Sequence, residues 1–100
     1  MTNIEYYTFQ GCNSLTLITI PNSVTNIGGF VFNGCQSLVS VTIPNSVKSI
    51  GASAFYNCTS LTTISYTGTI AQYNAITKGS KWHNRVPATV VHCIDGDTPI

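Results

Sequence analysis

The sequence predicts a repeat solenoid: a short right-handed coil with a parallel β-sheet on its concave side and an α/β cap at its C-terminal end. Two observations predict this fold. A unit of 23 residues recurs without insertion, so that Phe9, Phe32 and Phe55 are evenly spaced. Each unit also carries an apolar side that it cannot bury alone, so the units must stack on one another.

Each unit has two extended parts and a connecting turn. The first part, at 15–20 and again at 38–43, alternates apolar and hydroxyl residues, which predicts a strand with one face inside. The proline that follows ends the strand because proline lacks a backbone N–H. The second part, at 24–28 and 47–51, is predicted to be a short extended segment on the opposite wall. A turn then closes the coil, and Gly11, Gly34 and Asn57 share a position in it that favours positive φ.

The period divides the chain into repeats at 1–66 and a capping segment at 67–100. The repeats comprise a partial unit at 1–8, full units at 9–31 and 32–54, and a partial unit at 55–66. Leu38, Val41, Ile43 and Cys35 of the middle full unit are expected to be its most buried residues, because this unit has a neighbour on each side.

The capping segment is predicted to hold one helix and one strand. Thr69 is a suitable N-cap, and Gln72 stands three residues later, as in a capping box. Lys78 is expected in the last turn of this helix and Gly79 just after it. Trp82 is expected to cover the open end of the core. A final strand at 89–94 precedes a turn at Asp95-Gly96.

Composition narrows the class of partner. The net charge is +1 and 7% of residues are charged, against about 25% in an average domain. Lys78, Lys81 and Arg85 near Trp82 are too few to neutralise many phosphates, so no nucleic acid is expected. No apolar run reaches the ~20 residues that a membrane helix needs, so no membrane insertion is expected. The N-terminus lacks a signal-peptide pattern, and we interpret the chain as part of a longer protein.

The repeated unit resembles the BspA-like leucine-rich repeat family. The pattern F-x-G-C-x-S-L-x-x-x-T-I-P-N-S-V-x-x-I-G occurs as FQGCNSLTLITIPNSVTNIG and FNGCQSLVSVTIPNSVKSIG, with a partial copy FYNCTSLTTISYTGT. The tail from GTIAQYNAI to VVHCIDGD is also similar to the C-terminal segment of that family. The resemblance implies a curved solenoid from a surface or secreted protein, in a family in which several members are associated with adhesion. It implies no catalytic residue and no cofactor.

The outward positions of the predicted strands are the candidate binding residues. One column holds Leu17, Ser40 and Thr63, and a second holds Thr19, Thr42 and Ser65. Curved solenoids often bind partners on this side. The alternative is that serine and threonine are ordinary solvated strand residues, since both suit a half-exposed sheet.

The cysteines and one histidine allow a second interpretation. Cys12, Cys35 and Cys58 share a position in the repeat, which predicts a buried column of thiols rather than disulfides. His92 and Cys93 suggest a thiol nucleophile beside a base. Adjacent strand residues point to opposite faces, however, so these two are not expected to act together. The His92–Asp97 segment fits neither a zinc nor a calcium pattern, and no metal site is expected.

The sequence therefore predicts a non-enzymatic protein-interaction module that acts outside the cell or at its surface, with a host or cell-surface protein as partner. The alternative is a structural spacer without a ligand of its own. Self-association is also expected through strand 15–20, because a strand at the edge of a sheet pairs readily with another chain.

Overall fold

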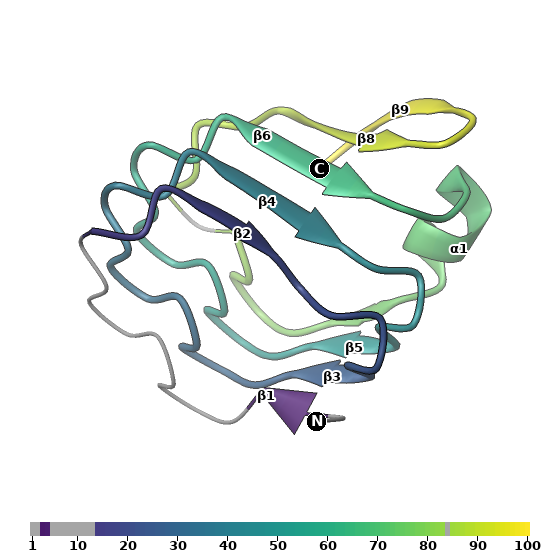
Figure 1. Ribbon diagram of the computed structural model, residues 1–100, viewed down its shortest axis with the longest axis horizontal. Helices are drawn as coiled ribbons and strands as arrows, with labels where there is room; N and C mark the ends of the chain where they lie inside the picture. Colours follow the sequence, from purple (N-terminus) through teal and green to yellow (C-terminus); the bar gives the residue numbers. More distant parts are fainter. Residues whose placement is uncertain (1–2, 5–13, 84) are drawn as a thin grey trace.

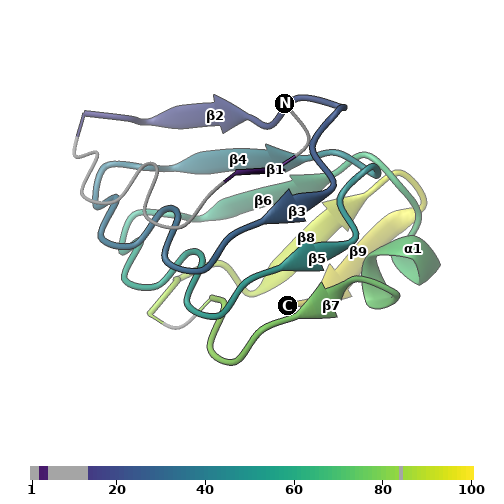
Figure 2. The same ribbon diagram turned by 90° about the horizontal axis from the view of Figure 1, so that it is seen from below.

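The computed structural model describes residues 3–4, 14–83 and 85–100. Within these residues the chain winds into a coil with a parallel sheet on each of two walls (Figure 1). The predicted solenoid is confirmed. The first wall is a sheet in the order β2 (Leu17–Thr19), β4 (Ser40–Ile43), β6 (Thr63–Tyr66), β8 (Val90–Cys93) and β9 (Gly96–Pro99). The second wall is β1 (Asn3–Ile4), β3 (Asn26–Ile27), β5 (Ser49–Ile50) and β7 (Thr77–Lys78), seen from below in Figure 2.

The repeat period sets the register of both sheets. Ile18 lies opposite Val41, and Val41 lies opposite Ile64, each 23 residues further along the chain. On the other wall Ile27 lies opposite Ile50 with the same spacing. The chain turns from one wall to the other at the predicted proline corner, where the Val47 N–H donates to the Pro44 carbonyl at 3.1 Å.

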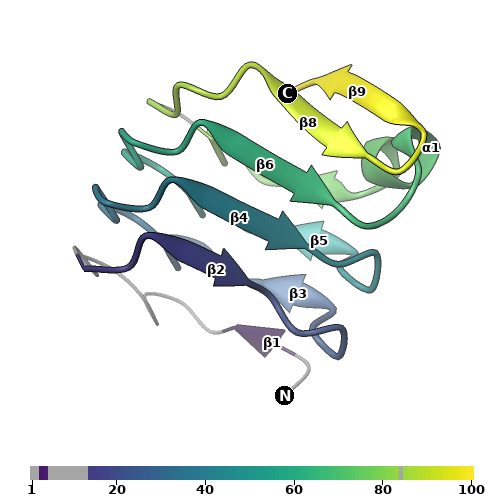
Figure 3. The same ribbon diagram turned by 45° about the horizontal axis from the view of Figure 1, so that its top comes forward.

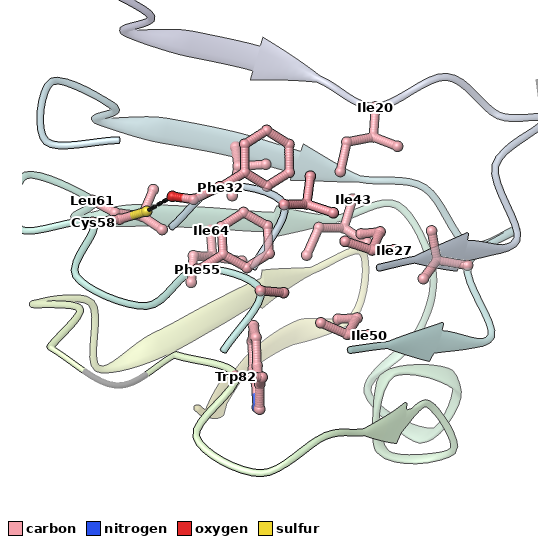
Figure 4. Packing of buried hydrophobic residues seen from close by; sticks show 14 of the residues in the cluster. Ile20, Ile27, Phe32, Ile43, Ile50, Phe55, Cys58, Leu61, Ile64 and Trp82 are labelled. Carbon is pink, nitrogen blue, oxygen red and sulfur yellow. Dashed lines mark hydrogen bonds between the residues drawn. The ribbon is translucent and has the colours of Figure 1, made fainter. Parts of the chain in front are cut away.

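The core lies between the two sheets and is built from stacked columns (Figure 4). The Phe32 and Phe55 rings are stacked with centroids 4.9 Å apart and planes 9° from parallel. Cys35, Leu38, Val41 and Ile43 of the middle unit all have 0% exposure, which confirms that this unit is fully buried on its inner side. Phe9 and Cys12, predicted to begin two of these columns, lie outside the described residues.

The connecting turn needs a left-handed backbone, as predicted. Gly34 has φ 75° and Asn57 has φ 64°, while Gly11 lies outside the described residues. The structure adds Arg85, with φ 64°, at the same point of the next turn. A second left-handed series precedes it in each turn, formed by Phe30, Ser53 and Lys81 with φ between 56° and 57°.

The predicted capping segment contains a further turn of the coil, which the sequence pattern did not reveal. β7 continues the second wall, since Thr77 pairs with Ser49, and β8 continues the first, since Val91 pairs with Ile64. These spacings are 28 and 27 residues instead of 23. The surplus residues form the helix α1 (Ile70–Asn74) between the two walls.

The helix begins where predicted but ends earlier. Thr69 is the N-cap, and both hydrogen bonds of the capping box with Gln72 are present. The helix ends at Asn74, so Lys78 lies in β7 and not in the last helical turn. Its ammonium nevertheless reaches back and donates to the carbonyls of Tyr73 and Ile76, at 3.2 and 3.1 Å. Lysine thus stabilises the helix end through space rather than from within the helix.

Gly79 belongs to the coil and not to a helix terminus. It stands beside Gly51 on the second wall, and a Cβ added to Gly79 would lie 2.3 Å from the Ala52 nitrogen. A Cβ on Gly51 would lie 2.4 Å from the Gly29 nitrogen in the same way. Glycine is required at this point because successive turns of backbone come into direct contact there.

The end of the chain is a hairpin rather than a single strand. β8 is shorter than the predicted strand at 89–94, and the chain turns near Asp95 as predicted. β9 then pairs antiparallel with β8 and forms the edge of the first wall (Figure 3). Trp82 is 5% exposed and meets the Phe55 ring edge-on, with centroids 6.1 Å apart, so it covers the aromatic column as expected and forms no patch with Lys81 and Arg85. In the described part of the chain, no helix is long and apolar enough to cross a membrane.

Candidate functional site: the outer face of the five-stranded sheet

The structure brings all six predicted surface residues together on the outer side of β2, β4 and β6. Parallel pairing places Leu17, Ser40 and Thr63 in one column and Thr19, Thr42 and Ser65 in a second. Neighbours in a column are about 4.8 Å apart, the spacing of adjacent strands. Leu17 is 62% exposed and Thr19 is exposed, while the other four are half-buried. We call this surface the outer sheet face.

The second column is longer than the sequence pattern predicted. Ser65 pairs with His92 on β8, and His92 pairs with Asp97 on β9. His92 Nδ1 and Asp97 Oδ1 are 2.7 Å apart and both side chains are about half-exposed. The outer sheet face thus runs from Thr19 to Asp97 across five strands. The 23-residue period does not predict His92 and Asp97, because the helix insertion changes the spacing of the last turn. The alternation of strand residues in 90–93 does place His92 on the outer side.

The hydroxyl, imidazole and carboxylate of Ser65, His92 and Asp97 therefore stand on three neighbouring strands. A serine nucleophile needs its hydroxyl within hydrogen-bond reach of the base. Within the residues that the structure describes, the Ser65 hydroxyl makes no hydrogen bond. The strand N–H groups, which would have to stabilise an oxyanion, are directed into the sheet ladders. The row therefore places hydrogen-bonding side chains at the surface of three neighbouring strands.

Cys93 lies on the other side of β8 from His92, in agreement with strand alternation. His92 is exposed, whereas Cys93 is half-buried and packs against the core cluster. Burial raises the pKa of the Cys93 thiol, and the nearby Asp95 and Asp97 raise it further. A raised pKa lowers the fraction of reactive thiolate at neutral pH. The two residues do not form a nucleophile and base pair.

The repeat cysteines lie inside the coil. Cys35 and Cys58 are both 0% exposed, and the Cys58 thiol donates to the Phe32 carbonyl at 3.0 Å. Burial and the neighbouring Cys35 raise the pKa of Cys58 to about 12. Cys58 is a free thiol, so the predicted column of buried cysteines is confirmed for these two rungs. Cys12 lies outside the described residues.

The two aspartates of the hairpin already have partners. Asp95 Oδ1 accepts the Ile70 N–H at 2.9 Å, which adds a second cap to the start of α1. Asp97 contacts His92, as described above. Among residues 3–4, 14–83 and 85–100, no three histidine, cysteine or acidic side chains gather in a way that could hold a metal ion.

Comparison with known proteins now assigns the coil to a family. The family model for the BspA type leucine rich repeat region, which contains six copies of the repeat, matches residues 1–80. The chain belongs to this family. No protein of curated function is similar enough to match it. The family match ends before β8, so the hairpin with His92 and Asp97 lies beyond the matched part of this BspA-type chain.

A solved structure supports the same assignment. The crystal structure at 1.80 Å resolution of a leucine rich cell surface protein from Faecalibacterium prausnitzii A2-165 is 45% identical in sequence and superposes with a TM-score of 0.74. The match covers 76% of this chain and 20% of that chain. The BspA-type chain is therefore similar to a fifth of a larger cell-surface protein.

Proposed function

We propose that the chain is a non-enzymatic protein-interaction module of a cell-surface or secreted protein and that it binds through the outer sheet face. The observation that carries this proposal is the row of polar outward side chains held in register across five strands. In Figure 3 the strands β2, β4, β6 and β8 lie in front, with no other described element over them. The likeness to a cell-surface protein supports the location.

The chemistry of this face suits a protein partner. Apart from His92 and Asp97, its residues carry no charge, and Leu17 adds an exposed apolar side chain at one end. The buried centres of protein interfaces are poor in charged residues, because removing a charge from water is costly. Hydroxyl groups at fixed spacing supply hydrogen bonds that orient the partner.

Charge introduced on the outer sheet face tests the proposal. A variant with Thr19→Lys, Ser40→Lys and Thr42→Lys is expected to lose at least about tenfold in affinity, because three ammonium groups would have to be desolvated in the interface. The measurement is surface plasmon resonance against immobilised extracellular-matrix proteins, together with adhesion of coated beads to epithelial cells.

The matched control adds the same charge elsewhere. Asn22→Lys, Gln36→Lys and Thr77→Lys change exposed residues that lie away from the outer sheet face, and this variant is expected to bind as the parent chain does. Circular dichroism checks that both variants fold. If both bound equally well, the outer sheet face would be the wrong surface.

A structural spacer is the second candidate. It is favoured by the continuous columns of buried residues. Each added unit extends these columns and so lengthens the coil, and this does not depend on the residues of the outer sheet face. A spacer would bind none of the proteins or cells above, and swapping its outer residues would leave the larger protein's adhesion unchanged. Binding by the isolated chain that the three lysines abolish would reject this alternative.

A further inference from the structure

The helix insertion leaves a cleft in the side of the coil. The proline corner at Pro21 is joined to the next one, at Pro44, because the Ser46 hydroxyl donates to the Val24 carbonyl at 2.7 Å. In the last turn α1 takes the place of that corner, and a cleft of about 90 Å³ remains between α1 and the end of the preceding corner. Its apolar walls are Val47, Tyr66, Ala75 and Ile76, and its polar residues are Lys48 and Gln72. This cleft lies at the strand ends, away from the outer sheet face.

Lys48 is the charged residue among those that line the cleft. It is exposed, and in the described part of the chain its ammonium contacts no carboxylate. Asp95 and Asp97 are occupied by Ile70 and His92, and Glu5, the remaining acidic residue, lies outside the described residues. The carbonyls at the C-terminal end of α1 would repel an anion, but Lys78 donates to two of those nearby and offsets their negative charge.

We propose that this cleft binds a single glutamate side chain of a protein partner. Drug-sized ligands need pockets of about 300 Å³ or more, so a cleft of this volume admits only one small group. A glutamate side chain has a short aliphatic stem, which would contact Ala75 and Ile76, and a carboxylate, which would meet the Lys48 ammonium in a charge-assisted hydrogen bond. The site is independent of the proposed function, because it uses a different surface.

Nuclear magnetic resonance can detect this contact in the whole chain. The probe is the capped peptide acetyl-Ala-Glu-Ala-amide, and the comparison peptide carries glutamine in place of glutamate. The glutamate peptide is expected to shift the amide signals of Lys48, Ala75 and Ile76 in a titration that reaches tens of millimolar. The affinity is expected to be weaker than millimolar, because an exposed ion pair contributes at most about 1 kcal/mol and a Kd of 1 mM needs about 4 kcal/mol. The glutamine peptide is expected to bind at least about threefold more weakly, because the charge is lost.

Variants locate the site. Lys48→Gln is expected to weaken binding of the glutamate peptide to the level of the glutamine peptide. Ala75→Leu is expected to abolish the amide shifts because the larger side chain fills the cleft. Lys81→Gln removes the same charge from an exposed residue outside the cleft and is expected to bind normally. Acetate at equal concentration tests for general anion binding and is expected to cause no comparable shift.

Three results would each overturn the proposal. These are equal shifts with the two peptides, equal losses in Lys48→Gln and Lys81→Gln, and a response that persists in Ala75→Leu. The three-lysine variant of the outer sheet face separates this test from the proposed function. It keeps the peptide response if the cleft is the site, whether or not the outer sheet face binds a partner.

Discussion

Arg85 holds a backbone conformation that disfavours its side chain. Its φ of 64° equals that of Asn57, which holds the same position one turn earlier. Two turns earlier this position is held by Gly34, with φ 75°. A residue with a Cβ is strained in the left-handed region by roughly 1–2 kcal/mol, while glycine is not. Arg85→Gly is therefore expected to stabilise the chain by up to about 1 kcal/mol, since glycine also loses more entropy on folding. Urea unfolding followed by circular dichroism measures the difference.

Arg85→Ala provides the control for this prediction. It removes the same long, exposed side chain but keeps the Cβ, so the strain remains. Its free energy of unfolding is expected to stay close to that of the parent chain. A gain of equal size in both variants would show that the arginine side chain, and not its backbone, carries the cost.

His83 makes the stability of the fold depend on pH. It stands half-buried beside Trp82, with ring centroids 4.8 Å apart, and burial lowers its pKa below the ordinary value of 6.5. Since the folded state disfavours the charged imidazole, the unfolded state binds the proton more readily. Stability is thus full above about pH 6.5, falls as the pH drops below that value, and levels off below the folded-state pKa.

His83→Gln isolates this effect from the other titrating groups. The difference in unfolding free energy between His83→Gln and the parent chain is expected to change between pH 7 and pH 5 and to be constant above pH 7. Thermal melts over this pH range measure it. Parallel melting-temperature curves for the two proteins would contradict the assignment.

The helix α1 and the β8–β9 hairpin stabilise each other through Asp95. Its carboxylate accepts the N–H of Ile70, the first helical residue, while the Ile94 N–H donates to the Gly68 carbonyl at 3.0 Å. Asp95→Ala removes the first of these bonds and is expected to cost about 1 kcal/mol, as for other helix caps. Asp95→Asn keeps an oxygen at the same place and is expected to cost less. Equal losses in these two variants would contradict the capping role.

The start of α1 could be predicted from sequence, whereas its end could not. Thr69 and Gln72 carry a local signal, since a capping box depends only on residues three apart. The end depends on where Thr77 must pair with Ser49 in the second wall. That pairing is a long-range contact, so the predictions of Lys78 in the last helical turn and Gly79 just after it are wrong.

Strands inside the first wall are expected to be better protected against hydrogen exchange than the strand at its edge. β4 has a neighbour on each side, while β2 lies at the edge of the first wall in the described part of the chain. Opening β4 requires breaking two ladders, so Val41 and Ile43 are expected to exchange more slowly than Ile18, by about tenfold or more. Amide exchange followed by mass spectrometry measures this order. Equal exchange rates in β2 and β4 would indicate that the coil opens as one unit.

The same measurement tests self-association through β2. An edge strand carries backbone groups that another chain can bind. If two copies pair along this edge, exchange at Leu17 and Thr19 slows as the protein concentration rises, because alternation along the strand directs their N–H groups away from β4. Exchange at Val41 does not change. Exchange rates independent of concentration, with a constant mass by light scattering, would count against pairing.

The pairing of strands in the two walls explains how much of the fold could be predicted from the sequence. Phe32 to Phe55 and Leu38 to Leu61 are linked by an unbroken period, so sequence alone predicts their columns and the coil that they imply. The six residues of the outer sheet face on β2, β4 and β6 follow from the same period. The last turn keeps the registers but not the period, so β7, His92 and Asp97 follow only from the three-dimensional pairing of strands.

The number of residues in a turn does not determine how far that turn lengthens the coil. The last turn uses 27 to 28 residues where its predecessors use 23, yet its strands stack on the same two walls. Extra residues placed at the corner bulge sideways as α1 and add nothing to the length of the coil. Counting sequence repeats therefore underestimates the width of sheet available to a partner. Corners of this kind are the places where a protein of this family could gain a new contact surface while every rung of its frame stays in place.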